Sequence, residues 1–298
     1  MQELKKCENP CAIALGNFDG LHRAHMEIIN SCIDYSRKNG LLSGVLLFDR
    51  HTSEVFGKDV KLLTTIEEKL SILESAGVDF VYIMHFDESV AKTDSKKFIE
   101  NILTDFNVNA FFVGYDYSFG KGAKGTAGIL KEYGEELGFR TIVTRCMKDN
   151  GEIISSTTVR ELVEQGKMKK AKAFLGRNYF VTGEVMKGFG NGTKSLFPTA
   201  NVEIKKNKFL PPDGVYVGIT HVDGVKYKSA VNIGKNPTFD AKERTIESYI
   251  LDFDGEIYGK TVTVEFLERI CGDKKFESID ELKKQIEHDI EMVRRINL

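Results

Sequence analysis

The chain has 298 residues, of which 41% are hydrophobic and 29% are charged, as in ordinary globular proteins. At about 150 residues per domain, this length predicts two domains and excludes a disulfide scaffold, a collagen-like repeat and a disordered chain. The 42 basic and 44 acidic residues give a net charge of −2, so we expect no nucleic-acid partner and no membrane surface. Five cysteines without a C-x-x-C pair indicate neither a disulfide framework nor a zinc site. No signal peptide or membrane-spanning run is visible, which predicts a cytoplasmic protein.

The first half alternates short apolar runs with amphipathic stretches. Strands are predicted at Cys11–Leu15, Gly44–Phe48, Phe80–His85 and Ala110–Gly114, and helices at Met26–Lys38, Ile66–Ala76 and Ser95–Phe106. Strands that alternate with helices of this length predict a parallel sheet with helices on both faces, a Rossmann-like α/β domain. Ligands of such sheets bind beyond the carboxyl ends of the strands.

The second half changes character after about Leu175. Six strands are predicted, at Tyr179–Met186, Thr199–Ile204, Gly214–Val222, Val225–Ile233, Thr245–Phe253 and Lys260–Ile270. A single helix over Ile279–Ile296 follows, with Leu282, Ile286, Ile290 and Val293 on one face. This pattern predicts a small closed antiparallel barrel with a C-terminal helix. We place the domains at residues 1–174 and 175–298.

The loop after the first strand reads Gly16-Asn17-Phe18-Asp19-Gly20-Leu21-His22-Arg23-Ala24-His25. Its glycines allow a tight turn, and the helix that follows presents free N–H groups that suit phosphate. His22 and His25 share one face of that helix and could donate hydrogen bonds to a triphosphate during attack on its α-phosphate. A helix-capping loop with two solvated histidines is the alternative.

A second candidate phosphate site is Ile154-Ser155-Ser156-Thr157-Thr158-Val159-Arg160. It opens a helix that Thr158 and Glu161 are placed to cap, and its hydroxyls and arginine suit phosphate oxygens. Ordinary capping would explain either segment alone. Together, at the ends of one α/β domain, the two segments favour a nucleotidyl transferase.

A third glycine-rich segment, Gly188-Phe189-Gly190-Asn191-Gly192-Thr193-Lys194-Ser195, is close to a Walker loop. A strand follows it instead of the helix that a Walker loop needs. We therefore expect Gly188, Gly190 and Gly192 to form a flap over ATP phosphates.

These motifs together resemble the bacterial bifunctional riboflavin kinase/FMN adenylyltransferases (FAD synthetases). The matching segments are Gly16 through His25, Val113 through Gly120, Ile154 through Arg160, Pro198-Thr199-Ala200-Asn201, and Leu210 through Tyr216. The resemblance covers nearly the whole chain in the same order. It implies two ATP-dependent activities: phosphorylation of riboflavin to FMN, and adenylylation of FMN to FAD.

The resemblance also implies roles for single residues. The ATP phosphates would be held by Gly16, Asn17, Phe18, Asp19, Gly20, His22, His25, Ser156, Thr157, Arg160 and Thr199, with both histidines stabilising the transition state. Asp116 and Asn232 would contact flavin, and Thr199 and Asn201 would bind Mg²⁺. Glu247 would be the general base for the riboflavin 5′-hydroxyl. The implied substrates are ATP, riboflavin and FMN.

The chain departs from the family pattern at Ala24, Arg50, Thr52, Thr193, Leu196, Tyr249 and Cys271. These changes leave two alternatives open: only one half is active, or the chain is a flavin-binding or RNA-binding regulator descended from such an enzyme. A class I aminoacyl-tRNA synthetase, suggested by the two histidines alone, lacks support from the charge balance. The sequence does not indicate the oligomeric state.

Overall fold

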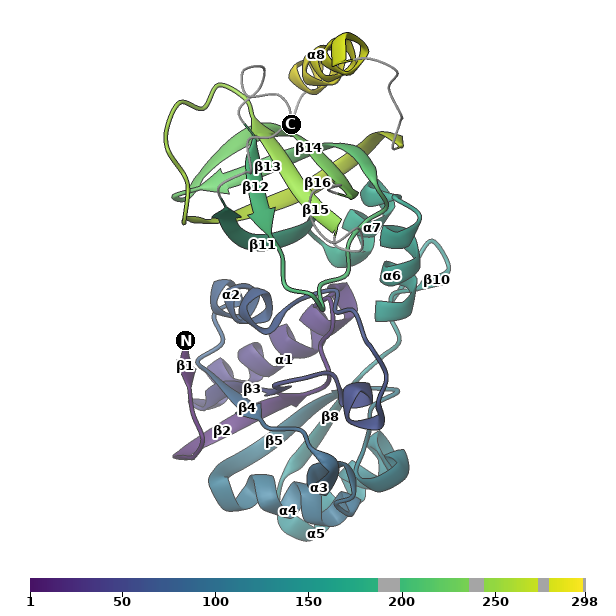
Figure 1. Cartoon of the computed structure of the whole chain (residues 1–298). Coiled ribbons are helices and arrows are strands. Elements are labelled where there is room, and N and C mark those ends of the chain that lie inside the picture. The colour runs from purple at the N-terminus through teal and green to yellow at the C-terminus, as the bar shows by residue number, and fades with distance from the viewer. Residues whose placement is uncertain (187–198, 236–243, 273–278, 297–298) are drawn as a thin grey trace. The chain divides into compact units, whose positions relative to one another are not determined.

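The computed structural model describes residues 1–186, 199–235, 244–272 and 279–296. The chain forms two compact units, Met1–Ser156 and Thr157–Leu298 (Figure 1). The predicted phosphate flap with Gly188, Gly190 and Gly192 lies outside the described residues. In the part of the chain that is described, no helix is both long and apolar enough to cross a bilayer.

The first unit is built on a six-stranded parallel sheet with the strand order β1-β4-β3-β2-β5-β8. Its strands are β1 (Gln2–Glu3), β2 (Cys7–Leu15), β3 (Leu42–Phe48), β4 (Phe80–Met84), β5 (Phe106–Gly114) and β8 (Arg140–Thr144). The predicted parallel sheet is confirmed. The sequence prediction lacked β8 because this short edge strand carries no run of buried apolar side chains.

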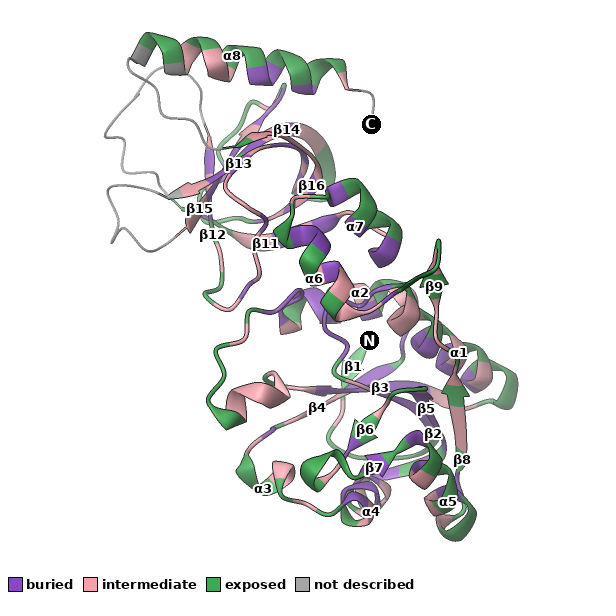
Figure 2. Ribbon diagram, turned by 90° about the vertical axis from the view of Figure 1, so that its right-hand side faces the viewer, coloured by how far each residue is buried: buried purple, intermediate pink, exposed green. Residues whose placement is uncertain are grey.

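Helices cover both faces of the sheet, as predicted. They are α1 (Arg23–Asn39), α2 (Ile66–Ala76), α4 (Ser95–Asp105) and α5 (Ala127–Leu137), the last of which was not predicted. Alternate residues of β2 enter two separate cores: Ala12 and Ala14 pack with Ile29 of α1, whereas Ile13 and Leu15 belong to the core that contains α4 and α5. Figure 2 shows the buried residues concentrated along β2, β3 and β5.

The ends of α2 follow from its sequence. The Thr65 hydroxyl accepts the Glu68 N–H at 3.3 Å, and the Glu68 carboxylate accepts the Thr65 N–H at 2.9 Å, so the two residues form a capping box. Gly77 ends the helix with a φ of 83°, a left-handed conformation that glycine adopts without strain. The same box fixes the direction in which residues 62–65 enter the helix.

Short elements complete the first unit. They are the 3-10 turns η1 (Thr52–Phe56) and η2 (Lys121–Ala123), the helix α3 (Glu88–Ala91), and the strand pairs β6 (Ser118–Phe119) with β7 (Gly125–Thr126) and β9 (Lys148–Asp149) with β10 (Glu152–Ile153). Most of them lie in the connections that follow the carboxyl ends of the sheet strands.

The second unit contains a closed six-stranded barrel with the strand order β11-β12-β15-β14-β13-β16, and all its strand pairs are antiparallel. Its strands are β11 (Tyr179–Met186), β12 (Ala200–Glu203), β13 (Gly214–Val222), β14 (Val225–Lys235), β15 (Arg244–Ile250) and β16 (Thr261–Gly272). The predicted barrel is confirmed. Strand β15 ends before the predicted Phe253 because Asp252 adopts a left-handed φ of 56°.

Three helices accompany the barrel: α6 (Ser156–Glu164), α7 (Met168–Leu175) and α8 (Ile279–Arg295). On the predicted apolar face of α8, Ile290 and Val293 are buried and Ile286 is half-buried, while the Leu282 side chain lies outside the described residues. Val293 packs against Val217 and Leu251. Because α6 and α7 fold with the barrel, the compact units divide after Ser156, before the predicted boundary at 174/175. That boundary separates the two expected activities and stays a prediction.

Candidate active sites

The first candidate site lies where the order of the sheet reverses direction. From β2 the chain adds β3 and β4 on one side, and then β5 and β8 on the other. The carboxyl ends of β2 and β5 therefore flank the crevice in which open α/β sheets bind ligands. The loop Gly16–His25 follows β2, and Asp116 follows β5, so the fold brings these two predicted segments to one edge.

Backbone strain marks the loop after β2. Phe18 and Leu21 have φ angles of 47° and 41°, although neither is glycine, and both side chains are fully buried. Such conformations cost roughly 1–3 kcal/mol each and persist only where the surrounding packing enforces them. Gly20 has a φ of 83°, and a Cβ there would approach Leu63 Cδ1 to 2.9 Å. Packing thus fixes this turn in one shape.

Asp19 fastens the turn to the segment before α2. Its buried Oδ1 accepts the N–H groups of Leu63 at 2.9 Å and Thr64 at 3.3 Å. In return the Gly20 N–H donates to Thr64 Oγ1 at 2.9 Å. The Asp19 side chain therefore shapes the loop through the backbone of residues 63–64.

His22 and His25 stand together at the start of α1. The His22 ring caps the helix, because its Nδ1 accepts the His25 N–H at 3.3 Å. The two rings stack with centroids 3.6 Å apart, and the edge of His25 meets Phe18 at 5.3 Å. An accepting Nδ1 leaves the proton of the neutral imidazole on Nε2, which is a hydrogen-bond donor. The first turn of α1 contains no acidic residue, so its positive end is not neutralised there.

The second predicted phosphate segment meets the first at Ser156, whose hydroxyl donates to the Asp19 carbonyl at 2.8 Å. Helix α6 begins at Ser156, so Thr158 lies inside its first turn and the predicted cap at Thr158 is wrong. Thr157 and Arg160 belong to the second compact unit. There the Arg160 guanidinium lies 5.1 Å from the centroid of the Phe209 ring.

Asp116 is exposed just beyond the end of β5. A Cβ on Gly114 would lie 3.0 Å from Asp116 Oδ1 and 3.5 Å from Ile28 of α1. The neighbouring Tyr117 ring stacks on Phe119 at 5.4 Å and anchors the segment. The Asp116 carboxylate thus lies beside Gly114 at the end of β5, on the side that faces Ile28 of α1.

A small cavity of about 20 Å³ lies beside the loop. It is lined by Asn17, by Phe48 through His51 after β3, by Leu62, and by Ile66 and Lys69 of α2. Lys69 is buried, and its Nζ donates to the Asn17 carbonyl at 2.9 Å. Sequence reasoning missed Lys69. The available signal was a lysine on the apolar face of α2, in register with Ile66 and Leu73.

The second candidate site is a row of side chains across three barrel strands. Glu247 of β15 lies directly opposite Asn201 of β12 on one side and Asn232 of β14 on the other. Directly paired residues project from the same face of a sheet, with Cβ atoms about 4.5–5.5 Å apart. The flanking rows, which contain Ile246 and Ser248, are fully buried in the barrel interior. Glu247, Asn201 and Asn232 therefore share the outer face.

Burial raises the pKa of Glu247 above its ordinary value. A carboxylate with a raised pKa is a stronger base than a solvated one, as general-base catalysis requires. Thr199, half-buried, lies two residues before Asn201 at the start of β12. The structure thus brings together four of the residues predicted for the second half.

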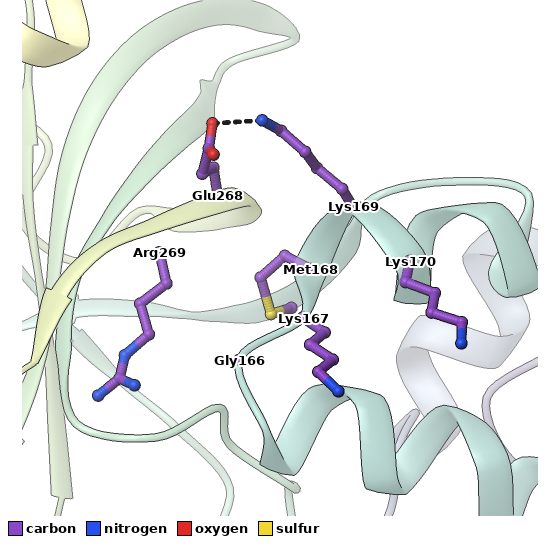
Figure 3. Close-up of a pocket in the computed structure, with 7 residues that line it drawn as sticks. All are labelled: Gly166, Lys167, Met168, Lys169, Lys170, Glu268 and Arg269. Atoms are coloured by element: carbon purple, nitrogen blue, oxygen red, sulfur yellow. Dashed lines mark ion pairs between the residues drawn. The ribbon is translucent and has the colours of Figure 1, made fainter.

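A further cavity of about 320 Å³ in the second unit contains none of the predicted residues (Figure 3). It is lined by Gly166 through Lys170 and by Glu268 and Arg269 of β16. Figure 3 shows Lys169 paired with Glu268, at 2.7 Å. The Arg269 guanidinium donates to the Asp213 carbonyl at 2.6 Å. Since these charged groups bind protein atoms, we do not assign the cavity to either site.

Comparisons with known proteins show the family to which each half of the chain is similar. The family model for FAD synthetase matches residues 4–158, and that for riboflavin kinase matches residues 175–297. The bifunctional riboflavin kinase/FMN adenylyltransferase of Bacillus subtilis is 33% identical over 96% of this chain and 92% of its own length. The enzyme of that name from Escherichia coli is 33% identical, over 94% and 90%.

A solved structure titled as a macrolide-efflux protein from Streptococcus pneumoniae is 30% identical. It covers 100% of this chain and 99% of its own, with a TM-score of 0.88. The fold described above is therefore also known from a solved structure over its full length. From both family models and these full-length relatives, the chain belongs to the family of bifunctional riboflavin kinase/FMN adenylyltransferases.

Proposed function

We propose that the chain phosphorylates riboflavin to FMN in the barrel unit and adenylylates FMN to FAD in the α/β unit, with ATP as the donor for both. One observation carries this proposal: each family match contains its own cluster of candidate residues. The loop Gly16–His25 lies within residues 4–158, and the Glu247 row lies within residues 175–297. We propose functional limits at 1–174 and 175–298.

In adenylyl transfer, a phosphate oxygen of FMN attacks the α-phosphorus of ATP. The new P–O bond forms as the bond between the α-phosphorus and the bridging oxygen breaks, and pyrophosphate leaves. No protein nucleophile is needed, so catalysis consists of positioning and stabilisation of charge. We assign those tasks to the positive N-terminal end of α1, to His22 through its Nε2, and to His25, with Ser156, Thr157 and Arg160 as further phosphate ligands.

In the kinase reaction, Glu247 accepts the proton of the riboflavin 5′-hydroxyl as that oxygen attacks the γ-phosphorus and ADP leaves. Asn232, which is exposed beside Glu247, is placed to orient the flavin. Because Glu247 lies on the outer face of the barrel, its carboxylate is accessible to a substrate. A carboxylate in the barrel interior would not be.

We further propose that the kinase reaction uses Mg²⁺ held through Thr199 and Asn201. The hydroxyl and amide oxygens of these residues, beside the Glu247 carboxylate, form a hard-oxygen donor set that fits this ion. Among the described residues no group of three or more His, Cys, Asp or Glu could hold a metal, so the remaining ligands would be phosphates and water. When bound, Mg²⁺ neutralises charge on the transferred phosphoryl group.

We also propose the cytoplasmic location that the sequence predicts. All five cysteines are free thiols, as is usual where the environment is reducing.

The decisive experiment incubates the purified chain with riboflavin, ATP and Mg²⁺ and separates the flavins by chromatography, with a second run that starts from FMN. FMN followed by FAD is the expected result. FAD from added FMN alone would restrict activity to the α/β unit. Retained flavin binding without any product would instead favour a regulator.

A further inference from the structure

Residues 209–213, which lead into β13, are held by side chains of the barrel. They form no regular secondary structure, so no strand partner satisfies their half-buried backbone carbonyls. The Arg244 guanidinium donates to the carbonyls of Leu210, at 3.5 Å, and Pro211. Its Nε also donates to the Asp213 carboxylate at 2.6 Å. One side chain thus binds both ends of this segment.

Two further side chains hold the same segment. The Tyr216 hydroxyl donates to the Pro212 carbonyl at 2.6 Å, and the Arg269 guanidinium donates to the Asp213 carbonyl at 2.6 Å. Tyr216 belongs to β13 and Arg269 to β16. Arg244 differs from both because it belongs to β15, the strand that carries the proposed general base of the kinase reaction.

Arg244 is the first residue of β15, and Glu247 follows three positions later. Alternate residues of a strand share a face, and Ile246 and Ser248 are fully buried in the barrel interior. Arg244 therefore starts on the interior face and reaches residues 210–213 from inside the end of the barrel. Glu247 stands on the opposite, outer face of the same strand.

The start of β15 has a partner strand on one side only. With β14 the ladder begins at Arg244 itself, opposite Lys235. With the short β12 it comprises three residue pairs and ends at Ile246 opposite Val202, one residue before Glu247. On that side, the bonds from Arg244 to residues 210–213 hold β15 beyond the last pair.

We propose that Arg244 is a positioning residue of the kinase reaction, which fixes β15 so that the Glu247 carboxylate meets the riboflavin 5′-hydroxyl. A general base must lie within hydrogen-bond reach of the proton that it accepts, and a displacement of about 1 Å can lower a rate on the order of 100-fold. This inference rests on the proposed riboflavin phosphorylation and adds the residue that holds its base in place.

The test is steady-state kinetics of FMN formation in the full chain. Arg244→Met, which keeps an unbranched stem, is expected to lower kcat at least tenfold while the KM values for riboflavin and ATP change less than twofold. Tyr216→Phe is the matched control, because it removes a hydrogen bond to the same segment from a strand that does not carry Glu247. It should lower the melting temperature, as Arg244→Met does, but leave kcat within twofold of wild type.

Three results would overturn the proposal: an unchanged kcat in Arg244→Met, equal falls of kcat in Arg244→Met and Tyr216→Phe, or a rise of either KM without a fall in kcat. Should Arg244→Met fail to fold, Arg244→Lys decides, because lysine keeps the charge beside Asp213 but lacks the planar fork that reaches the two carbonyls. A fall of kcat by about threefold or more then supports the proposal, and an unchanged kcat rejects it. FAD formation from added FMN reports whether the α/β unit is intact. If the wild-type chain makes no FMN from riboflavin, the proposed function itself has failed.

Discussion

His22 combines a structural and a chemical role in one ring. Its Nδ1 caps α1, and its Nε2 is the atom that we propose for the contact with phosphate. The sequence showed two histidines three residues apart, which is equally compatible with simple capping. In the structure the cap uses Nδ1, so capping and the proposed phosphate contact through Nε2 are not exclusive.

Two substitutions at His22 separate these roles. Asparagine is a good N-cap but has no imidazole, so His22→Asn should keep the stability and lose FAD formation by at least tenfold. His22→Ala should lose both, with a cost of about 1 kcal/mol in the free energy of unfolding. Urea denaturation and FAD formation from FMN measure the two effects. Equal FAD formation in His22→Asn and wild type would contradict the assignment of the imidazole.

Glu247 is the corresponding residue of the barrel, where burial opposes its ionisation. The unfolded carboxyl ionises from about pH 4.5, whereas the folded one keeps its proton to higher pH. Stability associated with Glu247 is therefore present at low pH and is lost as the pH rises through the folded pKa. The burial that suits Glu247 to its proposed role as a general base therefore lowers the stability of the protein at neutral pH.

Glu247→Gln should abolish FMN formation and raise the melting temperature at pH 8, by about 2 °C. The stability gain should vanish near pH 4, where the wild-type carboxyl is neutral in both states. In the wild type, the kinase rate should fall as the pH is lowered through the raised pKa. Calorimetry at the two pH values and a pH–rate profile provide the measurements. The account would be contradicted if Glu247→Gln were less stable than wild type at pH 8 but equally stable at pH 4.

At the scale of elements, the loop between β2 and α1 owes its shape to a neighbouring segment. Asp19 and Gly20 are fastened to Leu63 and Thr64, which lead directly into α2. The capping box of α2 could be predicted from Thr65 and Glu68, because it depends on residues three apart. Contacts across 44 or 45 positions could not, and they determine the strained turn.

Gly20→Ala should disrupt this turn and reduce FAD formation at least tenfold, with the kinase rate unchanged. The added Cβ meets both a left-handed backbone and Leu63. Gly138→Ala is the matched control, since Gly138 has a similar φ of 84° but open space around its Cα. It should cost about 1 kcal/mol of stability without affecting either rate. Equal rates in the two variants would show that the approach to Leu63 is unimportant.

At the scale of the whole molecule, the two activities are assigned to separate units, each with its own ATP site. FMN is the product of one and the substrate of the other. If the sites work independently, a product released by one molecule can be used by another.

This independence predicts complementation in a mixture. Glu247→Gln alone should make FAD from FMN but not from riboflavin, and Thr199→Ala should behave likewise. His22→Asn should stop at FMN. Glu247→Gln and His22→Asn mixed in equal amounts should convert riboflavin to FAD, which chromatography of the flavins detects. No FAD from the mixture, with each single variant behaving as described, would mean that FMN does not pass between molecules.

The sequence by itself determined the parallel sheet, the barrel and the local motifs, since these depend on periodicity and on residues a few positions apart. It missed α5 and β8, whose patterns are weak, and the burial of Lys69, because a lysine is ordinarily exposed. Only the tertiary structure decided that Glu247 faces outward with Asn201 and Asn232, because strand register selects the face. It also placed Lys69 against Asn17, a contact 52 residues apart that depends on how α2 packs beside the loop.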